Sequence, residues 1–173
     1  MTRPRILLHV GAPKCGSSAL QTALSEARGL TLPDGRLLTY TAARADKSGG
    51  WVPQTGLRLR MMAARAPHGY AAWPDLGRGD ATAAGFAALN KVWSRSDARH
   101  LPMVSQEGCI DRAALFHDAL PHWFTPQEGV TIFAAARPPL EWINAAWWQW
   151  GIWSGLSFDQ WLERRVMPYR LGT

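Results

Sequence analysis

The sequence predicts an α/β protein, specifically a P-loop-containing three-layer sandwich with a central parallel sheet. A strand-length apolar run, Arg5–Val10, ends at a glycine loop that opens a helix. Two further apolar runs, Leu101–Ser105 and Val130–Ala136, are continuous, which is typical of central strands buried on both faces of a parallel sheet. Helix-forming segments separate these runs, and strands that alternate with helices favour a parallel sheet covered by helices.

The first elements follow from the order of apolar and turn residues. The strand Arg5–Val10 leads through the loop to a helix over about Ser18–Arg28. Gly29 is expected to close that helix as its C′ residue. The stretch 30–56 is rich in turn-forming residues and lacks periodicity, so it is predicted to be a long loop with short elements. Loops of this length in compact domains are often functional lids.

Helices and strands alternate through the rest of the chain. The expected helices cover about Leu57–Ala66, Ala81–Ser96 and Asp111–Leu120, a segment that begins at Pro138 or Pro139, and Ser157 to about Val166. Asp111 is a favourable N-cap and Pro121 a stop signal. Prolines at 138 and 139 suit the first turn of a helix, and Ser157-x-x-Gln160 is a capping-box pattern.

The composition is that of one globular domain, expected over residues 1–173. The chain is 47% hydrophobic and 18% charged, which separates it from disordered sequences. No apolar run approaches the length of a membrane span, and Ile6–Val10 is too short for the core of a signal peptide. We therefore expect a cytoplasmic protein.

The charge distribution and the positions of cysteine and histidine argue against nucleic-acid and metal binding. The net charge of +6 comes from 19 scattered basic residues without a dense run or a nucleic-acid-binding signature, so no nucleic acid is expected as a partner. Cys15 and Cys109 lack zinc or redox spacing and are expected to be free thiols. His117 and His122 have no metal-ligand spacing either, so no metal site is expected.

The glycine loop carries the main functional signal. In the common nucleotide-binding loop, G-x-x-x-x-G-K-[ST], the lysine follows the second glycine. Here Gly11 and Gly16 keep the spacing, but Ser17 takes the place of that lysine and Lys14 lies inside the loop. Neither later apolar run ends in an aspartate that could hold a metal. The loop is therefore expected to bind an anion through backbone N–H groups and the helix dipole, without an obligatory metal.

The loop resembles the 5′-phosphosulfate loop of sulfotransferases, P-K-[ACST]-G-[ST]-[ST], in the run Pro13-Lys14-Cys15-Gly16-Ser17-Ser18. These enzymes use 3′-phosphoadenosine-5′-phosphosulfate (PAPS) as the sulfuryl donor. The resemblance implies that the donor is bound by Pro13, Lys14, Cys15, Gly16, Ser17 and Ser18. It also implies that Lys14 stabilises charge on the leaving phosphate.

A second element, Phe133–Glu141, is similar to the family's strand–R-[DN]-P-L-E motif. In the family this arginine, together with a serine eight positions later, grips the 3′-phosphate of the donor. By this resemblance Arg137 takes the arginine's role, and the serine position is held by Ala145 with Asn144 beside it. Trp147-Trp148-Gln149 is similar to the bacterial carbohydrate-type branch. Because family members usually continue past this point, we expect a C-terminally shortened chain or an unusually short member.

Two residues are candidates for the base that takes the acceptor's proton. His68 lies in the Pro67–Tyr70 break, where bacterial relatives often have a histidine, and the alternative is an ordinary surface histidine. Glu107 follows a predicted strand, and Ser105-Gln106-Glu107 resembles a family S-x-E element. Glu107 could act as the base or position Lys14, and the alternative is a helix-capping carboxylate.

The tryptophans between residues 142 and 161 occupy more than one face of the predicted helix, so that helix is expected to be largely buried. The alternative is an aromatic wall for a sugar or for adenine. Taken together, the motifs predict a PAPS-dependent sulfotransferase that acts on an acceptor hydroxyl, with a carbohydrate as one candidate. The alternatives are a P-loop small-molecule kinase and a PAPS- or nucleotide-binding pseudoenzyme.

Overall fold

The computed structural model of the chain describes residues 6–45, 47, 50–72, 87–88, 99–107 and 129–167. The chain forms two compact units, Met1–Ala135 and Ala136–Thr173. The helices expected over Ala81–Ser96 and Asp111–Leu120 lie outside the described residues, apart from a helical pair at 87–88.

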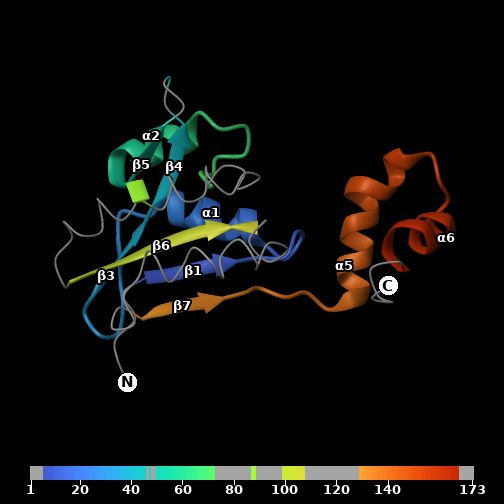
Figure 1. Ribbon diagram of the computed structural model, residues 1–173, viewed down its shortest axis with the longest axis horizontal. Helices are drawn as coiled ribbons and strands as arrows, with labels where there is room; N and C mark the ends of the chain where they lie inside the picture. The colour runs from blue at the N-terminus through green and yellow to red at the C-terminus, as the bar shows by residue number, and fades with distance from the viewer. Residues whose placement is uncertain are drawn as a thin grey trace. The chain divides into compact units, whose positions relative to one another are not determined.

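A five-stranded, mostly parallel sheet forms the centre of the first unit (Figure 1). Its strands, in order across the sheet, are β2 (Leu30–Thr31), β3 (Leu37–Tyr40), β6 (His100–Gln106), β1 (Ile6–Val10) and β7 (Val130–Phe133). Three of the pairings, β3–β6, β6–β1 and β1–β7, are parallel, and β2–β3 is antiparallel. The predicted α/β class with a central parallel sheet is confirmed at this level.

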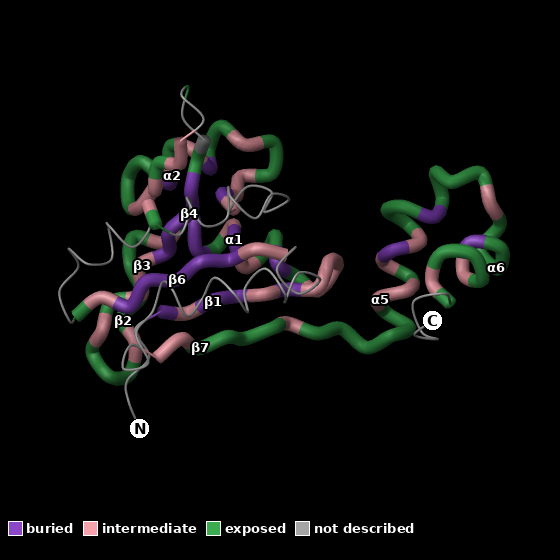
Figure 2. The backbone as a smooth tube through the Cα atoms, in the orientation of Figure 1, coloured by how far each residue is buried: buried purple, intermediate pink, exposed green. Residues whose placement is uncertain are grey.

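The core lies between the middle strands and two helices. β6 is buried from Leu101 to Ser105, and β1 buries Ile6, Leu8 and His9 (Figure 2). Helices α1 (Ser17–Glu26) and α2 (Gly56–Ala64) contact one another, and α1 also contacts β6. The buried apolar cluster that joins these elements consists of Leu24, Tyr40, Ala42, Leu59, Ala63, Ala71 and Met103.

The stretch 30–56, predicted to be a long loop with short elements, contains four short strands, and two of them belong to the main sheet. β3 pairs in parallel with β6, with Leu38 opposite Leu101, and so belongs to the main sheet. The turn between β2 and β3 is closed by Gly35 at φ 82° and by an Asp34–Arg36 ion pair of 2.7 Å. β4 (Ala42–Ala45) and β5 (Trp51–Gln54) form a separate antiparallel pair. The strands are only two to four residues long and turn residues surround them, which hides them from periodicity.

Two predicted boundaries also differ from the structure. Helix α1 ends at Glu26, because Ala27 adopts an extended backbone with ψ 133°, so Gly29 is not its C′ residue. β7 stops at Phe133 instead of Ala136 and lies at the end of the strand order, not in the centre. Its Ile132 is 53% exposed, so an unbroken apolar run did not guarantee burial on both faces.

The second unit is a compact helical segment. Helix α5 (Pro139–Ala146) continues into a π-helical turn, Trp147–Gly151, and a short 3₁₀ turn, Ile152–Ser154. Helix α6 (Phe158–Trp161) continues into a second π-helical turn, Leu162–Val166. The predicted capping box is confirmed: the Ser157 hydroxyl accepts from the Gln160 N–H, and the Gln160 side chain accepts from the Ser157 N–H.

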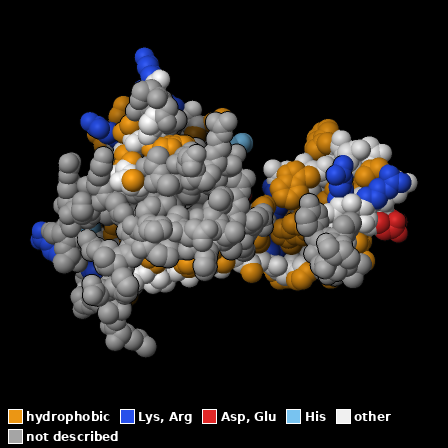
Figure 3. Space-filling model, in the orientation of Figure 1, with side chains coloured by type: hydrophobic (Ala, Val, Ile, Leu, Met, Phe, Trp, Pro, Cys, Tyr) orange, Lys and Arg blue, Asp and Glu red, His pale blue; other side chains and the backbone are white. Residues whose placement is uncertain are grey.

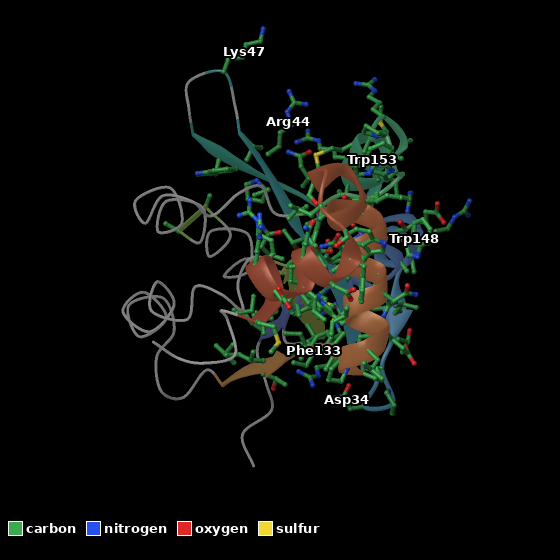
Figure 4. The ribbon with its side chains drawn as sticks, turned by 90° about the vertical axis from the view of Figure 1, so that its right-hand side faces the viewer. Asp34, Arg44, Lys47, Phe133, Trp148 and Trp153 are labelled. Atoms are coloured by element: carbon green, nitrogen blue, oxygen red, sulfur yellow. The ribbon has the colours of Figure 1, made fainter. Side chains whose placement is uncertain are left out.

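Aromatic packing holds this unit together. The Trp147 ring lies edge-on to Phe158 and Trp161, with centroids 5.4 and 5.6 Å away. Trp161 is buried, but Trp148 and Trp153, labelled in Figure 4, are 63% and 83% exposed. The prediction of a largely buried tryptophan helix was therefore wrong for these side chains. Hydrophobic side chains cover much of the visible face of this unit (Figure 3).

Candidate anion-binding site

The glycine loop, defined here as Gly11–Ser18, connects the end of β1 to the start of α1. β1 lies between β6 and β7 and is parallel to both, so the loop emerges at the carboxyl edge of the sheet, beside the ends of two other strands. In open α/β sheets, this edge is where ligands bind. The predicted order of strand, loop and helix is therefore confirmed, and the loop lies at the carboxyl edge of the parallel strands.

The backbone φ angles of the loop alternate in sign. Lys14 has a φ of 68°, Gly16 a φ of 89°, and Cys15 between them is not in the positive-φ region. Successive residues of opposite hand turn their N–H groups toward one side and form a concave nest for an anion. Among the described residues, Lys14 is the one non-glycine residue with positive φ. Such a conformation is costly for a lysine and tends to occur at functional sites.

The start of α1 faces the same loop. Its N-cap is Gly16, which has no side chain to satisfy the first N–H groups, and its first turn contains no acidic residue. The first bond of the helix runs from the Leu20 N–H to the Gly16 carbonyl, 3.1 Å away. The preceding N–H groups, from Ser17 to Ala19, have no acceptor within the helix, and they add to the positive end of the helix dipole.

The two serines of the loop differ in environment. Ser18 is exposed, and its carbonyl accepts a 2.8 Å hydrogen bond from the Thr22 hydroxyl. Ser17 is 1% exposed, and its Oγ has no hydrogen-bond partner among the described residues. Cβ on an alanine at position 11 would lie 2.4 Å from this Oγ, so only glycine fits there. Ser17 thus occupies the position where the common loop has lysine, but as a buried hydroxyl.

A buried polar network lies beneath the loop. His9 on β1 shares a 2.7 Å hydrogen bond between its Nδ1 and the Ser105 Oγ on β6. Gln21 on α1 donates to the same oxygen from its Nε2, at 3.1 Å. Burial lowers the pKa of His9 below its usual value of 6.5, so the ring is neutral at pH 7. The ring of Phe133, labelled in Figure 4, lies against the His9 ring with centroids 4.9 Å apart.

Sequence reasoning did not assign His9 or Gln21 to the site, and it used Ser105 only as part of a motif. The available signal was chemical: a histidine within an apolar strand and a glutamine on the buried side of a helix both need partners. The partners are up to 96 residues apart in the sequence, so periodicity could not identify them.

Glu107 comes close to the loop through strand register. Val10 pairs with Gln106, so Gly11 and Glu107 are the next residues on neighbouring parallel strands. The Glu107 side chain is half-buried. The register therefore brings this predicted carboxylate to the base of the glycine loop.

His68 lies elsewhere in the first unit. It is exposed in the turn after α2, and its ring stacks on Tyr70 with centroids 5.9 Å apart. The nearby Ala71 N–H donates to the Ser25 hydroxyl, and the Ala71 carbonyl accepts from the Tyr40 hydroxyl. Ser25 is next to the last residue of α1 and lies roughly 12 Å along the helix axis from Ser17, at 1.5 Å per residue. The segment that carries His68 is therefore anchored at the far end of α1 from the loop.

The three residues assigned to the 3′-phosphate belong to the second unit. Arg137 is exposed and precedes Pro138, the N-cap of α5. Asn144 is exposed and Ala145 half-buried, both in the second half of α5.

The first unit also contains a cavity of about 150 Å³ between the end of α1 and β3. Leu24, Arg28, Leu38 and His100 are among the residues that line it, and none of the lining residues belongs to the glycine loop. The cavity is therefore separate from the candidate site.

Comparison of the chain with protein-family models, with curated proteins and with solved structures found no match. Within the described part of the chain, no group of three or more His, Cys, Asp or Glu side chains could hold a metal ion. The described helices also include none that is both long enough and apolar enough to cross a membrane. Cys15 is a half-buried free thiol, and Cys109 lies outside the described residues.

Proposed function

We propose that the protein is a sulfotransferase that moves a sulfuryl group from PAPS to an acceptor hydroxyl, with the 5′-phosphosulfate of the donor bound at the glycine loop. One observation carries the proposal: a lysine sits inside a loop of alternating hand, between the end of β1 and the uncapped start of α1. Such a loop offers N–H groups and a cation to the same anion. The sequence motif around Lys14 supports sulfate transfer over other anion chemistry.

The chemistry asks little of the protein beyond position and charge. The acceptor oxygen attacks sulfur in line, the bond between sulfur and the phosphate oxygen breaks, and the negative charge remains on the departing 3′,5′-bisphosphate (PAP). Lys14 would stabilise that charge, and the N–H groups at the start of α1 would hold the 5′-phosphate. Arg137 and Asn144 are the proposed partners of the 3′-phosphate.

Glu107 is the better candidate for the base. The acceptor's proton must go to a group near the reacting sulfur, because a general base acts within hydrogen-bond reach or through one water. Strand register places Glu107 beside Gly11, whereas the segment of His68 is anchored at the opposite end of α1. We therefore propose Glu107 as the base and give His68 no role in proton transfer. The acceptor class proposed from the tryptophan motif is a carbohydrate hydroxyl.

The proposal predicts a nucleotide preference that calorimetry can measure. The wild-type protein should bind PAP more tightly than ATP with Mg²⁺, because position 17 lacks the lysine of ATP-binding loops and the sequence motifs around Lys14 and Arg137 resemble those that bind the two phosphate groups of PAPS. Lys14→Ala should weaken PAP binding and abolish donor turnover with little change in melting temperature. The matched control is Lys47→Ala, since Lys47 is an exposed lysine in the turn between β4 and β5.

Two results would contradict the proposal. The first is a preference of the wild-type protein for ATP with Mg²⁺, which would favour a kinase. The second is PAPS binding without transfer to water or to any hydroxyl in a broad acceptor set, which would favour a pseudoenzyme.

A further inference from the structure

Two buried polar atoms face the same point beneath the glycine loop. The Oγ of Ser17 and the Nε2 of His9 lie 2.4 and 3.2 Å from the position that a Cβ on Gly11 would occupy. Ser17 is 1% exposed and His9 is fully buried, and neither atom has a hydrogen-bond partner among the described residues. A buried polar atom left without a partner is costly, so two such atoms beside the same position call for an explanation.

The His9 ring is fixed from behind. Its Nδ1 is bonded to Ser105, Ser105 accepts from Gln21, and Phe133 covers the ring. The three elements that supply these contacts are β6, α1 and β7, which surround β1. Because the ring is held on these sides, its Nε2 points to one place, the space beside Gly11 and Ser17.

The two atoms are complementary. In one tautomer of the neutral ring, Nε2–H donates to the Ser17 oxygen and Ser105 donates to Nδ1. In the other, Nδ1–H donates to Ser105 and the bare Nε2 accepts the Ser17 proton. An anion in the loop selects the first arrangement, because only then is the Ser17 hydrogen available to the anion.

We infer that His9 is a positioning residue that orients the Ser17 hydroxyl toward an anion bound in the glycine loop. This inference rests on the proposed function only in so far as the loop binds a phosphate or sulfate group. The bond between Nε2 and Oγ forms when the loop is occupied, as bonds in ligand-binding sites commonly tighten on binding. The absence of a side chain at Gly11 is what lets the two atoms approach.

A double-mutant cycle on the full chain tests this role. The probes are PAP and ATP with Mg²⁺, and the variants are His9→Asn, Ser17→Ala and the double variant. Ser17→Ala and His9→Asn should each weaken binding of the preferred probe about tenfold, which corresponds to roughly 1.4 kcal/mol. The double variant should bind no more weakly than Ser17→Ala alone, because His9 acts through the Ser17 hydroxyl.

A second variant separates positioning from simple packing. Asparagine at position 9 keeps a polar atom where Nδ1 meets Ser105 and loses the atom near Ser17. His9→Gln does the reverse, since its amide reaches as far as Nε2. The inference therefore expects His9→Gln to retain more affinity than His9→Asn, whatever the order of their melting temperatures. Thermal unfolding of each variant shows whether it folds, and Ser105→Ala serves as a variant that loosens the ring without removing it.

The outcomes distinguish the inference from the proposed function. Additive losses of affinity, or equal affinity of the two His9 variants, would overturn the positioning role even if PAP is the preferred probe. Preference for ATP with Mg²⁺ and non-additive losses would overturn the sulfotransferase proposal and support the positioning role. A wild-type protein that binds neither probe would overturn both.

Discussion

Gly11→Ala offers a direct test of the geometry beneath the loop. A Cβ at this position would lie 2.4 Å from the Ser17 Oγ, 3.0 Å from the His9 Cε1 and 3.2 Å from the His9 Nε2. Contacts this short force neighbouring side chains to move, and both neighbours are buried and belong to a helix and a central strand. Overpacking of this kind costs about 1–3 kcal/mol. For a chain of this length each kcal/mol lowers the melting temperature by about 2–4 °C.

A cost of about 2 kcal/mol, the middle of the overpacking range, should lower the melting temperature of the Gly11→Ala variant by about 4–8 °C. The variant should also lose PAP affinity, because Ser17 is displaced. The clash has an identified partner, which allows a stronger test. Ser17→Ala removes the nearest atom, so Gly11→Ala should cost less in a Ser17→Ala background than in the wild type. Ser17→Ala alone should leave the melting temperature unchanged or raise it, since it removes a buried hydroxyl without a partner.

Gly16→Ala is a matched control for the mechanism. Apart from its chain neighbours, no described residue has a heavy atom within 4 Å of the position of a Cβ on Gly16, but its φ of 89° is unfavourable for alanine. Gly16→Ala should therefore destabilise the fold through backbone strain, and Ser17→Ala should not relieve it. Thermal unfolding of the two glycine variants in both backgrounds measures these effects. A wild-type melting temperature for Gly11→Ala, or equal costs in the two backgrounds, would refute the steric argument.

Two other predictions concern pH and the second unit. Because burial lowers the pKa of His9, the unfolded state binds more protons than the folded state below pH 6.5. The free energy of unfolding therefore does not depend on His9 protonation well above pH 6.5. It falls as the pH drops from 6.5 toward the lowered pKa, by at most about 1.4 kcal/mol per pH unit. Urea unfolding at pH 7.5, 6.5 and 5.5 should show a shallower loss for His9→Gln than for the wild type, and parallel curves would contradict this. Ala145→Ser should tighten PAP by about 1.5–3 kcal/mol through a new bond to the 3′-phosphate. Unchanged affinity in calorimetry would indicate that Asn144 already supplies this bond or that the motif register is wrong.

The elements that the sequence predicted well are those whose signal is local. β1, the glycine loop and α1 follow one another without a break, so apolar run, turn residues and helix start could be recognised together. The Ser157 capping box is also a pattern of neighbouring residues, and it forms as expected. β6 was predicted within one residue at each end because its apolar run is nearly continuous, although Pro102 lies inside the strand.

The features that escaped prediction depend on contacts between distant segments. β3 is a short strand whose stability comes from pairing with β6, about 60 residues later in the chain by register. The place of β7 at the end of the strand order is a property of topology, which hydrophobic periodicity does not encode. The network of His9, Gln21 and Ser105 combines three elements, and no local pattern in the sequence links the three residues to one another.

The buried network also explains how polar side chains can lie under the glycine loop without harm to the core. Its described bonds satisfy Ser105, Gln21 and one side of His9 within the first unit, so the polar atoms that remain open are those nearest the loop. Replacing the network by apolar residues could preserve packing, but it would leave the Ser17 hydroxyl without a group to orient it. A buried polar atom without a hydrogen-bond partner costs free energy. An anion that engages Ser17 would allow the Ser17–His9 bond to form and would remove that cost at the moment of binding, so ligand affinity and the stability of the loop should rise together.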